Sequence, residues 1–231
     1  MELITIIPAF FIFLYCLYKF IKDDYVFIRK NISLEQLFDM IFGVIWISLF
    51  VSRFLSFILN PFPSSNYFLA FFSLQNGGLS LTGAVLGGLL ALYGIGKYKK
   101  IPLGRLFDFF TLSFLIALPW GYLGLSIFLR KQALFLSVLN AAIYFILTFV
   151  FLKLLYPRFM NRTMKEGNLS IIFLTFFSVI SLGTSILRQI NNQATLLNLH
   201  HILLFSLFVS SLLFLLKQEG NTIRGRKGLK K

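Results

Sequence analysis

The sequence has few charged residues and very little negative charge. Only 13% of its 231 residues are charged, and 8 Asp and Glu stand against 22 Lys and Arg, which gives a formal net charge of +14. A soluble domain carries about a quarter charged residues. Because 58% of the residues are hydrophobic, the chain lacks the polar surface of a soluble nucleic-acid-binding domain. The composition excludes that class and favours an integral membrane protein.

Cysteine is nearly absent. The single Cys16 excludes a disulfide framework and a cysteine-based zinc site. It lies in the apolar run Leu3–Phe20, where a packed small hydrophobic residue is expected. This run has no basic residues before it and no small-residue cleavage site, and Tyr15 before Cys16 is unsuited to lipoprotein cleavage. We therefore expect a retained helix rather than a cleaved signal peptide.

Long apolar runs are abundant, and seven of them approach the roughly 20 residues that cross a membrane as a helix. We predict an all-α, polytopic transmembrane bundle with spans at about Leu3–Ile21, Leu37–Leu59, Leu79–Gly96, Leu106–Leu129, Ala133–Tyr156, Leu169–Leu187 and Leu199–Leu216. Pro119 interrupts the fourth. The connection Asn60–Gln75 is polar at first, and its aromatic half Tyr67–Leu74 predicts an interfacial or re-entrant segment.

The basic residues predict the orientation. Of the 22 Lys and Arg, 18 fall in alternate connections and in the tail, whereas the other side holds Arg130, Lys131 and Arg188. Basic loops stay in the cytoplasm, so the N-terminus is expected outside and the C-terminus inside. We expect residues 1–216 to form one transmembrane domain and residues 217–231 to form a basic cytoplasmic tail. A nucleic-acid patch is the alternative for this tail, but attraction to anionic lipid explains it more simply.

Arg53 is the exceptional charge at membrane depth. It lies six residues before the end of its span at Leu59, about 9 Å along a helix. A charge there needs a partner, a water-filled cavity or a lipid headgroup, and it can also snorkel to the interface. We favour a functional role over snorkelling.

A glycine-rich segment begins the third span. Gly83, Gly87 and Ala91 recur every four residues, which predicts a stripe where another helix approaches closely. Gly77 and Gly78 precede the helix, and their backbone N–H groups could face an anion.

Other polar residues suggest weaker roles. The run Pro119–Gly124 predicts a bend in the fourth span, suited to a lipid cavity or to ordinary packing. Asp108 is expected in the first turn of that span, where the helix dipole favours an acid. His200 and His201 point to different helix faces, so interfacial polar residues are expected rather than a metal pair.

The segment from Gly77 to Gly87 resembles the signature of the bacterial prolipoprotein diacylglyceryl transferase family, approximately Gly-Gly-x-Ser-x-His-Gly-Gly-x-x-Gly. Gly77, Gly78, Ser80 and Gly83 match it. The similarity extends to Arg53 at the end of span two, to Asp108, and to a Gly-x-x-Gly pair at Gly121 and Gly124.

The resemblance implies transfer of diacylglycerol from phosphatidylglycerol to the cysteine thiol of a prolipoprotein, at the outer leaflet of the bacterial cytoplasmic membrane and without a metal or other cofactor. The residues implied to line the site are Gly77, Gly78, Ser80, Thr82, Gly83, Gly121 and Gly124. Arg53, Arg188 and Tyr122 are the implied contacts of the lipid phosphate.

The sequence departs from the family at chemical positions. Thr82 replaces the signature His, and Tyr122 and Leu125 replace the Arg and Asn of a Gly-Arg-x-Gly-Asn-Phe motif. Of an Arg-Phe-x-x-Glu-x-x-Arg motif only Arg188 is kept. No catalytic residue is assigned. Two hypotheses follow, a diverged transferase that binds phosphatidylglycerol-like lipid, and a non-enzymatic lipid-binding or permease-type membrane protein.

Overall fold

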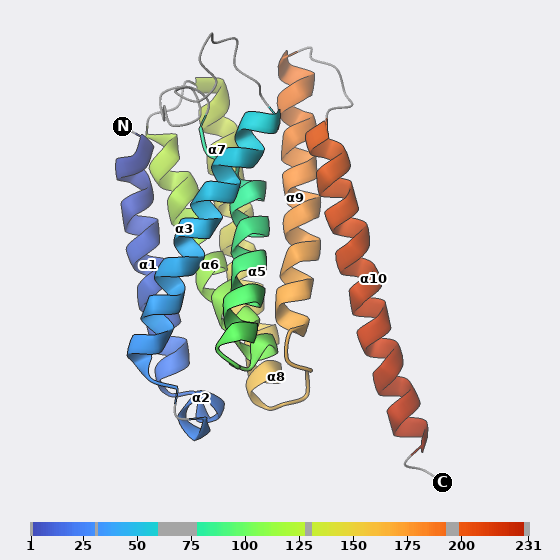
Figure 1. Cartoon of the computed structure of the whole chain (residues 1–231). Coiled ribbons are helices and arrows are strands. Elements are labelled where there is room, and N and C mark those ends of the chain that lie inside the picture. The colour runs from blue at the N-terminus through green and yellow to red at the C-terminus, as the bar shows by residue number, and fades with distance from the viewer. Residues whose placement is uncertain (1, 31, 60–77, 128–130, 193–198, 229–231) are drawn as a thin grey trace. The chain divides into compact units, whose positions relative to one another are not determined.

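The structure is a computed structural model, and it describes residues 2–30, 32–59, 78–127, 131–192 and 199–228 (Figure 1). These ranges are almost entirely helical and contain no strand. The elements are α1 (Glu2–Lys22), α2 (Tyr25–Arg29), α3 (Leu34–Leu59), α5 (Leu81–Tyr98), α6 (Leu103–Ser126), α7 (Lys131–Val150), the π-helical turn η1 (Phe151–Leu155), α8 (Tyr156–Met160), α9 (Asn168–Asn192) and α10 (Leu199–Gly228).

Six helical segments of the described chain are long and apolar enough to cross a membrane. They are Glu35–Leu59, Leu81–Tyr98, Leu103–Ser126, Leu134–Met160, Asn168–Gln189 and Leu199–Gln218. They confirm an all-α, polytopic bundle and correspond to six of the seven predicted spans. The remaining predicted span coincides with α1, a helix of 21 residues. The orientation of the termini stays a prediction.

The chain forms two compact units, which we describe separately. The first, here called the α3–α5 unit, is Lys22–Phe107 and holds α2, α3, α5 and the start of α6. The second, the α6–α10 unit, consists of Met1–Ile21 and Asp108–Lys231 and holds nearly all of α1, the rest of α6 and the later helices. The boundary therefore falls inside α6.

Aromatic side chains fill the interior of the α6–α10 unit. Phe109 is fully buried; its ring stacks on Phe20 with centroids 6.2 Å apart and meets Phe159 edge-on at 5.6 Å. Farther along the same helices, Phe13 of α1 meets Phe110 of α6 at 5.7 Å. Such ring pairs stabilise a core beyond the area that they bury. They join α1 to α6 although Phe20 and Phe109 lie 89 residues apart in sequence.

Several helix ends differ from the predicted span ends, among them those of the fifth and seventh spans. The fifth span continues past Tyr156 to Met160 through the wider π turn, in which the Tyr156 N–H bonds the Phe151 carbonyl. Pro157 explains this turn, because its ring conflicts with the carbonyl four residues earlier in a regular helix. α10 continues to Gly228, into the residues expected to form the tail. Pro119 lies within a continuous α6. The predicted interfacial segment Tyr67–Leu74 lies outside the described residues.

Candidate functional site

Two glycines of α5 make possible its close approach to α3. A Cβ atom added at Gly83 would lie 2.8 Å from the Cα of Ser52, and one added at Gly87 would lie 2.6 Å from the Cβ of Val51. Real Cβ atoms essentially never approach so closely. Ala91, the third member of the predicted stripe, is buried. The stripe thus brings the backbone of α5 against α3, as its spacing predicts.

Serines of α3 fix the register of this pair. Ser48 Oγ donates to the Ala84 carbonyl at 2.7 Å, and Ser52 Oγ donates to the Ser80 carbonyl at 2.8 Å. The Ser80 N–H in turn donates to the Ser52 carbonyl at 3.4 Å. Ser80 is also the N-cap of α5, since its Oγ accepts the Gly83 N–H at 3.2 Å. The start of α5 is therefore held by its own cap and by α3.

Arg53 reaches the glycine-rich segment. Its side chain is only 6% exposed, and Nη1 donates to the Gly78 carbonyl at 3.0 Å. Gly78 has φ +34°, a conformation that favours glycine. Thr82, in the first turn of α5, is buried in the same region. The structure thus brings together Arg53, Gly78, Ser80 and Gly83, whereas Gly77 lies outside the described residues.

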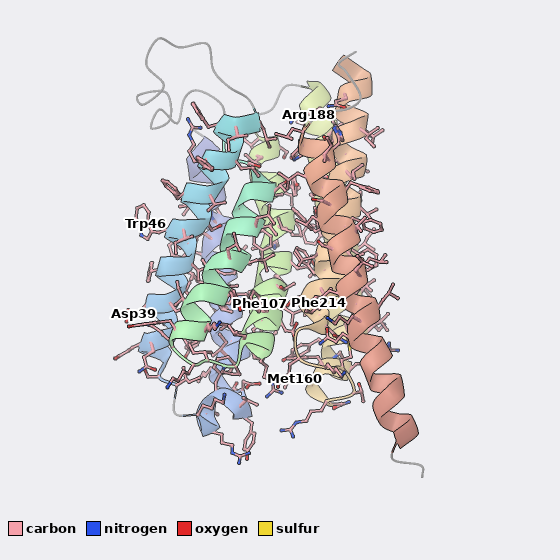
Figure 2. The ribbon with its side chains drawn as sticks, turned by 45° about the vertical axis from the view of Figure 1, so that its right-hand side comes forward. Asp39, Trp46, Phe107, Met160, Arg188 and Phe214 are labelled. Carbon is pink, nitrogen blue, oxygen red and sulfur yellow. The ribbon has the colours of Figure 1, made fainter. Side chains whose placement is uncertain are left out.

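The other predicted phosphate contacts lie in the α6–α10 unit. The rings of Tyr122 in α6 and Tyr144 in α7 stack nearly parallel with centroids 5.6 Å apart. Ser137 Oγ of α7 donates to the Tyr122 carbonyl at 2.7 Å. Arg188 is exposed and lies near the C-terminal end of α9 (Figure 2). It is near enough to Tyr122 to interact with it electrostatically. Ser181 of α9 lies beside the Tyr144 hydroxyl.

These two groups of residues are described each within its own unit. Arg53 belongs to the α3–α5 unit and Arg188 with Tyr122 to the α6–α10 unit. That all three contact one phosphate stays a prediction. Gly121, whose added Cβ would lie 3.7 Å from that of Ala9, makes an ordinary packing contact with α1. Within the described chain, no three His, Cys, Asp or Glu side chains gather closely enough to hold a metal ion.

A comparison with protein-family models shows the family of this chain. Residues 4–134, more than half of the chain, match the family model of prolipoprotein diacylglyceryl transferase. The chain belongs to this family. A search of curated proteins found no match, and a search of solved structures found none either.

The family match covers only part of the candidate residues. Arg53, the glycine-rich segment and Tyr122 lie inside residues 4–134, and Arg188 lies beyond them. The diacylglyceryl transferase region thus includes the whole α3–α5 unit and α6, whereas most of α7 and all of α9 and α10 fall outside it. The contact between Arg53 and Gly78 is a candidate feature that lies wholly within the family region.

Asp108 has a different role from the expected one. α6 begins at Leu103, so Asp108 lies beyond its first turn. Its fully buried carboxylate accepts the N–H of Gly167 at 2.6 Å, the N–H of Ser170 at 2.9 Å and the Oγ of Ser170 at 2.8 Å. These groups belong to the start of α9, where N–H groups have no partner inside the helix. Asp108 therefore caps a neighbouring helix instead of its own.

The two histidines have different environments. His201 is buried, and neither of its ring nitrogens has a hydrogen-bond partner in the described chain. His200 Nδ1 lies 3.5 Å from Ser185 Oγ of α9. His200 is half-buried, and the interfacial position of both histidines stays a prediction. Sequence reasoning missed Ser137, Tyr144 and Ser181, although Ser137 and Tyr144 are seven residues apart, a spacing that places them on one helix face.

Proposed function

We propose that this family member binds a phosphatidylglycerol-like phospholipid at the outer leaflet of the bacterial cytoplasmic membrane and has lost the transfer of diacylglycerol to prolipoproteins. The observation that carries the proposal is the contact of the buried Arg53 with Gly78 inside the family region. A buried cation on a glycine-rich segment is a suitable place for an anionic headgroup, because burial strengthens its attraction to a phosphate.

Arg53 has a double role in this proposal. A guanidinium carries five N–H donors in a planar fork. Holding the Gly78 carbonyl and contacting a lipid phosphate are therefore compatible for one side chain. The hydrogen bonds from Ser52 Oγ to the Ser80 carbonyl and from the Gly83 N–H to Ser80 Oγ support the same segment, so that the phosphate would meet preorganised backbone.

Arg188 provides the second cation. It is exposed beside the Tyr122–Tyr144 stack. Arg binds phosphate through paired, charge-assisted hydrogen bonds, and the amphipathic tyrosines suit the level of the lipid headgroups. We propose that Arg188 contacts a lipid phosphate within the α6–α10 unit, as Arg53 does within the α3–α5 unit, and that the acyl chains lie against the apolar outer faces of the helices.

The loss of transfer is argued from Thr82. Transfer needs a group that accepts the proton of the prolipoprotein thiol before sulfur attacks the lipid. Thr82 occupies the position of the signature His, and a threonine hydroxyl does not titrate near neutral pH as imidazole does. Tyr122, at the position of an Arg in the family motif, cannot supply a cationic contact to the leaving phosphate.

Complementation tests the loss of transfer. The chain is expressed in a strain depleted of its own prolipoprotein diacylglyceryl transferase, and membrane insertion and abundance are checked by immunoblotting of membrane fractions. We expect no rescue of growth. Rescue by the inserted chain would show that transfer is retained.

Lipid that co-purifies with the chain tests the binding. We expect phosphatidylglycerol, quantified by mass spectrometry, to fall in Arg53→Ala and in Arg188→Ala. The control is Arg158→Ala, which removes an exposed cation of α8 and should leave the bound lipid unchanged. Equal lipid in all three variants would contradict the proposed phosphate site.

A further inference from the structure

The short helix α2 turns an apolar face outward. Tyr25 is 60% and Ile28 59% exposed, whereas Phe27 is buried. Tyr25, Ile28 and Arg29 are three and four residues apart, which places them on one side of the helix, with Phe27 on the other. Arg29 and the following Lys30 are also exposed. The outward surface of α2 thus combines apolar side chains with cations.

This exposure is fixed by buried contacts. Asp24 caps α2 by accepting the N–H of Val26 at 2.9 Å and of Phe27 at 3.3 Å. The same carboxylate forms an ion pair at 3.4 Å with Arg105 near the start of α6, and both side chains are buried. Removal of either charge would take away the ion-pair contact from the other buried side chain, which is unfavourable. The ion pair therefore holds α2 with Phe27 inward and with Tyr25 and Ile28 outward.

The chain connections hold α2 close to the membrane surface. It begins three residues after the end of α1 and ends five residues before the start of α3. An extended chain spans at most about 3.5 Å per residue. The start of α2 therefore lies within roughly 10 Å of the end of α1, and its end lies within roughly 18 Å of the start of α3. α3 is long and apolar enough to cross a membrane, and α1 is the predicted first span. An α2 surface at this depth meets lipid headgroups.

The charge at this end of the α3–α5 unit complements anionic lipid. Exposed cations outnumber exposed carboxylates around α2 and the α5–α6 turn. The cations are Lys22, Arg29, Lys30, Lys97, Lys99 and Lys100, and the carboxylates are Asp23, Glu35 and Asp39. Cations beside a membrane surface attract anionic phospholipids.

We infer that α2 is an interfacial helix: Tyr25 and Ile28 enter the boundary between headgroups and acyl chains, and Arg29 and Lys30 bind the headgroups of anionic phospholipids. The side of the membrane is that of the α5–α6 turn, predicted to be cytoplasmic. This surface is separate from the outer-leaflet site proposed above, so either proposal can fail without the other. A lipid surface explains both the exposed Tyr and Ile and the cations.

Fluorescence quenching in vesicles tests this inference on the full chain. The variant Tyr25→Trp is made together with Trp46→Phe and Trp120→Phe, which leaves one indole as the probe. All three side chains are exposed, so the substitutions should not disturb packing. We expect a blue-shifted indole that is quenched by phospholipid brominated near the headgroup and is protected from aqueous iodide. An indole quenched by iodide and not by brominated lipid would overturn the interfacial placement.

A second measurement tests the preference for anionic lipid. Brominated phosphatidylglycerol at a minor fraction should quench more than the same fraction of brominated phosphatidylcholine, because each cation near the surface enriches anionic lipid about fivefold. Arg29→Gln with Lys30→Gln should reduce this difference, because Lys22 and the lysines of the α5–α6 turn remain. The pair Arg158→Gln and Arg162→Gln removes the same charge from another loop and should preserve it. Equal quenching by the two lipids before any charge is removed would overturn the headgroup preference.

Discussion

The Arg53 guanidinium donates a hydrogen bond to the Gly78 carbonyl at 3.0 Å. The contact joins the two features that the sequence marks separately, an arginine at membrane depth and a glycine-rich segment before a helix. It also gives the buried charge a partner, which a charge at this depth requires. In this diacylglyceryl transferase family member Arg53 is therefore part of the structure of the candidate site, whatever ligand it also binds.

Arg53→Ala is expected to destabilise the protein. It removes the hydrogen bond to the carbonyl of Gly78, a residue that is itself exposed, and a typical hydrogen bond contributes about 0.5–1.5 kcal/mol. In a chain of this size about 1 kcal/mol corresponds to roughly 2–4 °C in Tm. Thermal unfolding in detergent measures the change. Arg53→Lys should fall between Ala and the parent, because Lys keeps a charge but loses the planar fork. A parent-like Tm for Arg53→Ala would show that the contact contributes little.

Gly83→Ala and Gly87→Ala are expected to weaken the packing of α3 on α5. Each added Cβ would lie within 3.0 Å of α3 atoms, and such overpacking costs about 1–3 kcal/mol. Gly94→Ala is the matched control in the same helix, because an added Cβ there meets nothing within 4 Å. It should stabilise the helix, by up to about 1 kcal/mol. The measurement is again Tm in detergent, and a similar decrease for all three variants would show that the close approach is not the cause.

The part of the site that could be predicted is the part that rests on local spacing. Gly83 and Gly87 are one helical turn apart, so the sequence alone indicates a shared face and close packing. The partners of Arg53 and Asp108 could not be predicted in this way. Asp108 lies 59 residues from Gly167, and only the tertiary fold decides that it caps α9 instead of α6. The end of α10 could not be predicted from hydropathy either, because the helix continues through a charged segment to Gly228.

Asp108→Asn is expected to destabilise the α6–α10 unit. The carboxylate accepts hydrogen bonds from two backbone N–H groups and one hydroxyl. The amide NH₂ of Asn is a donor and would face donors. Loss of a helix cap costs about 0.5–2 kcal/mol. Ser170→Ala, which removes only the hydroxyl, should have a smaller effect. The Tm values of the purified variants show which substitution destabilises more. Asp39→Asn changes an exposed acid and is the control, whose Tm should equal that of the parent protein.

The Asp24–Arg105 pair provides a test of coupling. Asp24→Asn and Arg105→Gln each leave one buried charge without its partner in the pair, a loss of about 3–5 kcal/mol for a buried pair. The double variant removes both charges, so its loss should be clearly smaller than the sum of the single losses. Free energies of unfolding of the four proteins in detergent, titrated with denaturant, give the coupling. Additive losses would mean that the two side chains act independently. In that case the packing of Phe27 and the Asp24 cap, and not the ion pair, would hold α2 with Tyr25 and Ile28 outward.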